Sequence, residues 1–120
     1  RDIPDLGIEE GDDAGDLLVL GWGSTHGAIR QAVRRARAKG LAVSHAHLRY
    51  IHPMPSNTEA LLRRFKRVIV PEMNNGMLVK LIRSEFLIDA VGINKIAGQP
   101  FKVSEITRAI EEHAQTAGAA

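Results

Sequence analysis

The stretch LLVLGWGSTHGAIRQAVRRARAKG, residues 17–40, decides the fold. Its first four residues form a continuous apolar run in front of glycines, which is typical of a strand buried on both faces of a parallel sheet. After the glycines, apolar residues recur at helical spacing with arginines on the opposite face: Ile29, Ala32, Val33 and Ala36. Lys39-Gly40 ends that helix. The stretch therefore predicts a strand, a turn and an amphipathic helix, the unit from which α/β folds are built.

The same alternation continues along the chain. Further strands are predicted at residues 41–51, at 68–70 (where Pro71 stops the strand) and at 91–97. Further helices are predicted from a capping box at Ser56-Asn57-Thr58-Glu59 to Phe65, from Met77 to Leu87 with Leu78, Leu81, Ile82 and Phe86 buried, and from a Ser104 cap to about His113. This order of elements predicts an α/β fold of three layers with a doubly wound, mainly parallel, Rossmann-like sheet.

The two ends of the chain lack this pattern. Residues 1–16 show no periodicity and carry seven acidic side chains: Asp2, Asp5, Glu9, Glu10, Asp12, Asp13 and Asp16. They predict a flexible acidic linker in front of a folded domain at residues 17–113. Residues 114–120 predict a disordered tail.

Length and composition limit the class of protein. With 120 residues, 44% of them hydrophobic and 25% charged, the chain is expected to form one globular domain. No apolar stretch approaches the roughly 20 residues that span a bilayer, and no signal-peptide pattern is visible, so we expect a cytoplasmic protein without membrane contact. The first residue is Arg1, which predicts a piece of a longer polypeptide or, alternatively, an expression scar. Without cysteine, the chain has no thiolate for a metal, an iron–sulfur cluster or nucleophilic catalysis.

The net charge of +2 conceals a basic region. No acidic residue occurs between Leu17 and Thr58, where six basic ones do: Arg30, Arg34, Arg35, Arg37, Lys39 and Arg49. Such a region suits an acidic partner or an anionic ligand. Nucleic acid is the weaker alternative, because aromatic residues make up only 4% of the chain and no base-stacking platform is visible.

The glycine-rich turn GWGSTHG, residues 21–27, approaches a dinucleotide fingerprint without matching it. Gly21, Gly23 and Gly27 are spaced one residue too widely, and no acidic residue follows until Glu59. One interpretation is a tight strand-to-helix turn with Ser24 or Thr25 as the helix cap. The alternative is a small-anion or coenzyme-binding module, with a phosphate of coenzyme A or of a nucleotide over residues 21–27.

Three polar residues at alternate positions, His45, His47 and Arg49, would share one side of a strand. A His-x-His pair can bind zinc if a third ligand is present, and His52 and His26 are the candidates. The simpler interpretation is hydrogen bonding to neighbouring loops or to a partner subunit, and we expect no metal here.

Glu72 and Asn74 follow the third predicted strand, at the edge where open α/β sheets bind ligands. Glu72 suits a general acid or base, or the cap of the helix that follows. No nucleophile elbow or Walker loop is present, so no residue is predicted to be catalytic.

Taken together, four segments resemble the C-terminal, transketolase-C-like domain of the α subunit of 2-oxoacid:ferredoxin oxidoreductases. They are GWGSTHGAIRQAVRRARAKG, HAHLRYIHPMPSN, VIVPEMNNGMLVKLIRSEFLID and INKIAGQPF, and they cover about residues 17–108. The last segment is most similar to the 2-oxoglutarate-specific branch, with the pyruvate branch close.

The resemblance implies a parent complex that decarboxylates a 2-oxoacid on thiamine diphosphate with Mg²⁺. Electrons would pass through [4Fe–4S] clusters to ferredoxin, and with coenzyme A the product from 2-oxoglutarate would be succinyl-CoA. It also implies that this chain binds none of these cofactors itself. Its partners would be the preceding thiamine-binding domain and the β subunit, with a structural and assembly role. Expected contact residues follow the strands: Ser24, Thr25, His26, His47, Arg49, Glu72 and Asn74.

Overall fold

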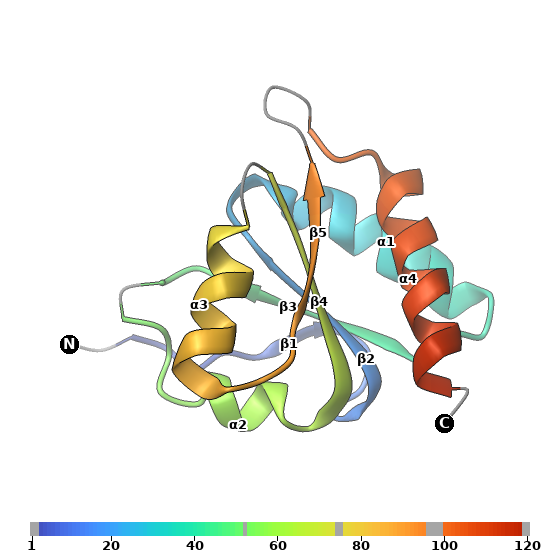
Figure 1. Ribbon diagram of the computed structural model, residues 1–120. Coiled ribbons are helices and arrows are strands. Elements are labelled where there is room, and N and C mark those ends of the chain that lie inside the picture. Colours follow the sequence, from blue (N-terminus) through green and yellow to red (C-terminus); the bar gives the residue numbers. More distant parts are fainter. Residues whose placement is uncertain (1–2, 52, 74–75, 96–99, 119–120) are drawn as a thin grey trace.

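A computed structural model describes residues 3–51, 53–73, 76–95 and 100–118. At its centre is a five-stranded sheet in the order β1-β3-β2-β4-β5 (Figure 1). Strands β2 (Gly15–Trp22), β3 (Val43–Leu48), β4 (Phe65–Met73) and β5 (Val91–Lys95) are parallel, and β1 (Ile8–Glu10) pairs antiparallel with β3. The predicted mainly parallel sheet is therefore confirmed.

Helices cover both faces of the sheet (Figure 1). Helices α1 (His26–Ala38) and α4 (Val103–Gly118) pack on one face, and α2 (Thr58–Leu62) and α3 (Met77–Phe86) on the other. A short 3-10 turn, η1 (Gly23–Thr25), joins β2 to α1. The result is the three-layer α/β architecture expected from the sequence.

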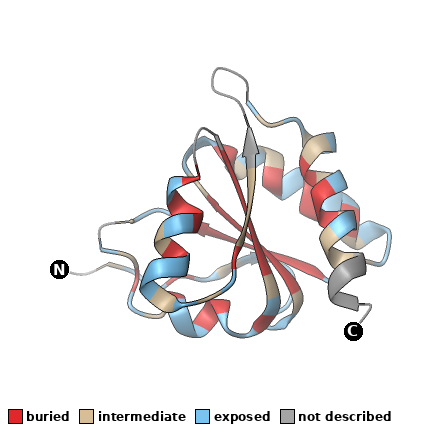
Figure 2. Ribbon diagram, in the orientation of Figure 1, coloured by how far each residue is buried: buried red, intermediate tan, exposed pale blue. Residues whose placement is uncertain are grey.

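The apolar run inside β2 supplies both hydrophobic layers, and the central strands are buried along most of their length (Figure 2). Leu17 and Val19 pack under α1 and α4, whereas Leu18 and Leu20 pack under α2 and α3, and all of them are fully buried. Successive side chains of a strand point to opposite faces, so a strand covered on both sides must be apolar at every position. No helix in the described parts of the chain is long and apolar enough to cross a membrane.

The N-terminal segment differs from the flexible linker that was expected. Residues 8–10 form the edge strand β1, and Gly15 and Asp16 already belong to β2. Leu6 is buried, and its backbone N–H and C=O both bond to the side chain of Asn57, at 2.7 and 2.8 Å. Tertiary pairing with β3 orders this segment although it has no pattern of its own.

Proline does not end β4, contrary to the prediction. The strand runs through Pro71, which pairs with Ile93 of β5. Pairing between β4 and β2 extends only to Val19 and Ile69. Pro71 lies beyond that pairing, where no β2 carbonyl needs the N–H that proline lacks.

The two predicted caps are wrong. Helix α2 has Asn57 and not Ser56 at its N-cap, the side chain of Asn57 bonds to Leu6, and Glu59 bonds to Arg63. Helix α2 ends at Leu62, because Phe65 already begins β4. Ser104 lies inside α4, and the carboxylate of Glu105 accepts from the backbone N–H of Lys102 in front of the helix. Helix α4 continues to Gly118, so the expected frayed tail is helical over most of its length.

The third helix agrees with the prediction in position and burial. Helix α3 begins at Met77 and buries Leu78 and Ile82, with Val79 in place of Leu81. Leu81 and Phe86 are half-buried at the edge of a groove described below.

Candidate functional site

The glycine-rich turn has the structural role that one interpretation gave it. A Cβ on Gly21 would lie 2.5 Å from Ile29 Cδ1 and 2.8 Å from His47 Nδ1, so any side chain here would force these neighbours on α1 and β3 to shift. Gly23 has a φ of +68°, a conformation that L-residues with side chains rarely adopt. Thr25 occupies the cap position, but its hydroxyl donates to Trp22 O at 3.0 Å instead of to the helix, and Ser24 is exposed.

The turn brings three histidine rings together, and we call His26, His45 and His47 the histidine cluster. His45 and His47 point from β3 toward the face covered by α1, and His26 is the first residue of α1. The ring centroids are 4.7 Å apart for His26 and His47, 5.3 Å for His26 and His45, and 5.7 Å for His45 and His47. The predicted shared side of the strand is confirmed for the two histidines of β3.

The outer members of the cluster have polar partners and the inner one has none. His47 Nε2 donates to Gly23 O at 3.2 Å. His26 Nε2 donates to Glu9 Oε1 at 3.0 Å, and Arg49 Nη1 donates to Glu9 Oε2 at 3.3 Å. Both ring nitrogens of His45, which is 0% exposed, lack a hydrogen-bond partner within the described structure.

Burial controls the protonation of the inner histidines. Desolvation first, and then the nearby His47 and His26, lowers the pKa of His45 to about 4. Burial also lowers the pKa of His47, although its bond to the Gly23 carbonyl acts in the opposite direction. The hydrogen bond from His26 and the charge and hydrogen bond of Arg49 lower the pKa of Glu9. At neutral pH, the two buried rings of the cluster, those of His45 and His47, are therefore uncharged, and the carboxylate of Glu9 is ionised.

Glu9 is not among the contact residues predicted from the sequence. It lies on the three-residue strand β1, in a segment expected to be a linker. The available signal was the block of acidic residues preceding a stretch with no acidic residue at all. Such a block predicts ion pairing in general but does not say which carboxylate meets Arg49 and His26.

The cluster does not have the arrangement of a zinc site. In the parts of the chain that the structure describes, no group of three or more histidine, aspartate or glutamate side chains is arranged to hold a metal ion. His52, one candidate for the third ligand, lies outside the described residues.

Glu72 caps a helix, as one of its two interpretations predicted. Glu72 is 3% exposed, and its carboxylate accepts from the backbone N–H groups of Leu78 at 2.8 Å and Val79 at 2.9 Å. A carboxylate at the positive end of a helix dipole satisfies amides that have no partner within the helix. Asn74, the other residue expected at this edge, lies outside the described residues.

The predicted contact residues therefore do not form one site. His26, His47 and Arg49 gather at the ends of β2 and β3, beside α1. Glu72 points to the opposite face of the sheet, toward α3. Thr25, His47 and Glu72 are buried, which leaves Ser24, His26 and Arg49 accessible to a partner.

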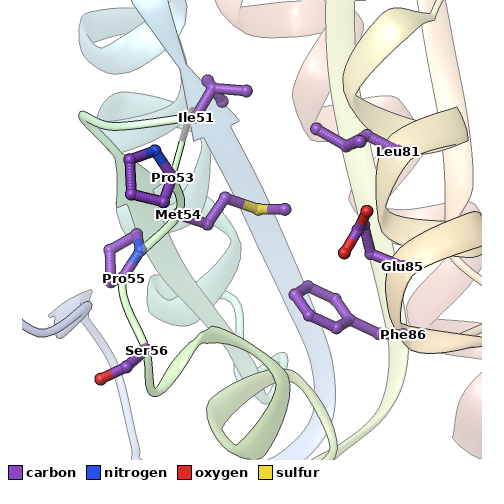
Figure 3. A pocket seen from close by; sticks show the side chains of 8 residues that line it. All are labelled: Ile51, Pro53, Met54, Pro55, Ser56, Leu81, Glu85 and Phe86. Atoms are coloured by element: carbon purple, nitrogen blue, oxygen red, sulfur yellow. The ribbon is translucent and has the colours of Figure 1, made fainter.

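Three hollows in the described structure are relevant to these residues, and a further one of about 440 Å³ lies on α1, lined by Gly27, Arg30, Gln31, Arg34 and Arg35. One of about 410 Å³, the basic depression, is lined by Trp22, Gly23, His26, His47, Leu48 and Arg49. A second of about 210 Å³ lies on the other side of Arg49 and includes Glu9 and Tyr50. Figure 3 shows a third, a groove of about 390 Å³ between the loop after β3 and α3, lined by Ile51, Pro53, Met54, Pro55, Ser56, Leu81, Glu85 and Phe86.

Comparison with known sequences gives a consistent result. Residues 15–106 match the family described as pyruvate:ferredoxin oxidoreductase core domain II. The chain is 43% identical over 108 residues to the 2-oxoglutarate oxidoreductase subunit KorA of Mycobacterium tuberculosis, and the match covers 90% of this chain. It is 29% identical over 97 residues to the 2-oxoglutarate synthase subunit KorA of Methanocaldococcus jannaschii, covering 79% of this chain. The chain spans 16% of the length of the first relative and 26% of the second.

Comparison with solved structures agrees. The fold superposes with a TM-score of 0.86 and 32% identity on a 2-oxoglutarate:ferredoxin oxidoreductase from Magnetococcus marinus with 2-oxoglutarate, coenzyme A and succinyl-CoA bound. That match covers 94% of this chain and 20% of the other. A split-gene transketolase shares the fold alone, with a TM-score of 0.69, 14% identity, and coverage of 92% of this chain and 41% of that one.

Proposed function

The chain belongs to the family of pyruvate:ferredoxin oxidoreductase core domain II, and from this premise we propose that it is the C-terminal assembly domain of an oxidoreductase α subunit. The parent enzyme converts a 2-oxoacid, coenzyme A and oxidised ferredoxin to an acyl-CoA, CO₂ and reduced ferredoxin in the cytoplasm. The 43% identity to a subunit of a 2-oxoglutarate oxidoreductase favours 2-oxoglutarate as substrate and succinyl-CoA as product.

The chain's own residues do not suit the cofactors of that reaction. Iron–sulfur clusters are held by cysteine thiolates, and the chain has no cysteine. No metal-holding group of side chains occurs in its described parts. We therefore propose that [4Fe–4S] clusters are held by the rest of the complex and that thiamine diphosphate and Mg²⁺, as the family resemblance implies, are bound there as well. No catalytic step is assigned to this chain.

The polar groups at the carboxyl ends of the strands support an assembly role. The carboxylate of Glu72 is already bonded to the N-terminus of α3, and His47 is bonded to the backbone carbonyl of Gly23. Ser24, His26 and Arg49 remain exposed or half-buried at this end of the sheet. These three residues are the ones proposed to contact the preceding thiamine-binding domain or the β subunit.

An assay of the purified chain tests the proposal that it is not catalytic. The chain is supplied with 2-oxoglutarate, coenzyme A and oxidised ferredoxin, and ferredoxin reduction is followed by absorbance. No reduction is expected from the chain alone, whereas the complete complex that contains it reduces ferredoxin. Coenzyme A-dependent reduction by the chain alone would contradict the proposal.

The assembly role has a separate test in the full-length α subunit. Deleting this domain is expected to prevent association with the β subunit, measured by size-exclusion chromatography with light scattering. Substituting Ser24, His26 and Arg49 together should weaken association more than substituting Arg30, Arg35 and Lys80, which are exposed elsewhere. Full assembly and activity without the domain would disprove the role.

A further inference from the structure

Positive charge exceeds negative charge where β2 and β3 end. Among the described residues, Arg49 and His26 at the start of α1 pair with the same carboxylate, that of Glu9. Glu10 pairs with Arg34, farther along α1, at 3.2 Å. Helix α1 is 13 residues long, with no acidic residue in its first turn and no side-chain cap on its N-terminus. The N-terminus of such a helix carries a partial positive charge of about half a unit.

The groups that bond to Glu9 have further hydrogen-bond donors that Glu9 does not occupy. A guanidinium has about five N–H donors, and Arg49 is 61% exposed on its side chain, with one contact to Glu9 through Nη1 in the described structure. His26 Nε2 contacts the other carboxylate oxygen. Glu9 itself comes from a three-residue edge strand whose pairing with β3 is irregular between Ile8 and Glu10.

The space beside this ion pair has no acidic wall. The basic depression is open, has about 410 Å³ of room, and is lined by Arg49, His26 and the Trp22-Gly23 backbone, without a carboxylate. His47, which is buried, also lines the depression, and its Nδ1 has no hydrogen-bond partner in the described structure. Trp22 supplies an apolar wall on one side.

We propose that the basic depression is a binding site for a phosphate group, held by Arg49 and His26, with Glu9 as an internal anion that competes for the same donors. Phosphate fits better than a single carboxylate because it carries more charge and more acceptor oxygens for a guanidinium and a helix N-terminus. The proposal goes beyond the assembly role but uses two of the same residues, Arg49 and His26, and a phosphate titration of this chain alone tests it separately from assembly.

Two substitutions that should change the phosphate affinity in opposite directions test the proposal. The ¹⁵N-labelled chain is titrated with inorganic phosphate at constant ionic strength, and the chemical shifts of the Trp22 indole and of the α1 amides are followed. Replacing Glu9 with Gln (E9Q) should tighten phosphate binding by about three- to fivefold, as expected for removing one exposed competing charge. R49Q should weaken binding by about tenfold or more, because a charge-assisted hydrogen bond is lost, and R49K should retain part of it.

The controls distinguish specific binding in the basic depression from general attraction of anions to a basic surface. Arg30 is exposed on α1 outside the depression, so R30Q should leave the affinity nearly unchanged. Pyrophosphate should bind at least as tightly as phosphate, and acetate more weakly. Equal losses in R30Q and R49Q, weaker binding in E9Q, or no saturable shift with phosphate would each overturn the proposal, whatever the assembly tests show.

Discussion

A single histidine makes the fold sensitive to acid. His45 is fully buried in β3 without a hydrogen-bond partner in the described structure, and burial lowers its pKa to about 4. An unfolded histidine titrates near 6.5, so between pH 6.5 and 4 the unfolded chain binds the proton more readily. The free energy of unfolding therefore falls as the pH drops through this window and is unaffected by His45 above it. His47, with its pKa also lowered, acts in the same direction.

Replacing His45 with Leu should remove much of this acid sensitivity. From pH 7.5 to pH 5, the free energy of unfolding should fall by about 2 kcal/mol less in H45L than in the original chain. At pH 7.5 the free energies of unfolding of the two chains should differ by less than about 1 kcal/mol, because no hydrogen bond is lost. Urea unfolding at both pH values measures this. H113Q is the comparison: burial also lowers the pKa of His113, which is half-buried, so this variant should change the pH dependence in the same direction but less than H45L. An unchanged pH dependence in H45L would contradict the prediction.

Glu72 should be important for stability although it is not assigned a catalytic role. E72Q keeps the shape of the side chain but loses the charge and one of two acceptor oxygens facing Leu78 N and Val79 N. We expect a loss of about 1–3 kcal/mol in the free energy of unfolding. Glu85 lies exposed on the same helix, so E85Q should change stability by less than about 0.5 kcal/mol. Equal effects of the two substitutions would show that the cap contributes little.

At the scale of the element, the turn between β2 and α1 uses its glycines for different reasons. G21A should destabilise by about 1–3 kcal/mol, because the added methyl group meets Ile29 and His47. G23A should cost about 1–2 kcal/mol, because its φ is positive while the space around it is empty.

The third glycine of the turn is the matched control. Gly27 lies in the first turn of α1 with open space around it and no positive φ, so G27A should stabilise by about 0.5–1 kcal/mol. Thermal unfolding of the three variants measures the series. If G21A were tolerated as well as G27A, the close approach of β2, α1 and β3 would be wrong.

The strand β1 depends on a side chain far away in the sequence. N57A removes both bonds to the Leu6 backbone and should cost about 1–3 kcal/mol. Amide hydrogen exchange in residues 6–10 should become faster, while exchange in β4 stays slow. S56A alters the exposed neighbouring residue and should leave exchange unchanged. Equal exchange in N57A and the original chain would contradict this anchoring.

These elements show which parts of the fold follow from sequence. Strand β2 and helices α1 and α3 were predictable because an apolar run or a helical period marks each of them. Strand β1 was not, because three residues that include two glutamates have no period, and their pairing partner lies more than 30 residues away. The capping box failed for a related reason: α2 begins one residue later than the box requires, with Asn57 at its N-cap, and the side chain of Asn57 bonds to Leu6.

The candidate site was predictable only in part. Alternation along β3 placed His45 and His47 on one side, and the helix-cap interpretation of Glu72 was confirmed. The approach of His26 depends on the conformation of the turn, and the approach of Glu9 on the edge pairing of β1. Both are tertiary effects that spacing alone does not contain.

At the scale of the whole molecule, one sheet joins two hydrophobic layers. Ile69 faces α1 and α4, whereas Val70 on the same strand faces α2 and α3. I69A should lower the free energy of unfolding by about 2–5 kcal/mol, and the layer on the other face should unfold at the same urea concentration. Resonances from Ile110 and Ile82 report the two layers. Separate midpoints for them would show that the layers fold independently.

The short strand β1 has a further consequence for how this domain can be handled. All six residues of β3 are buried, and β1 covers the backbone edge that β3 would otherwise present to solvent. The match to the family begins at residue 15, so a chain trimmed to the matched segment would lack β1. The bare edge would then offer a row of N–H and C=O groups to a strand of another molecule. In the intact domain, Glu9 and Glu10 place negative charge on the outermost strand, where it discourages such intermolecular pairing and favours solubility.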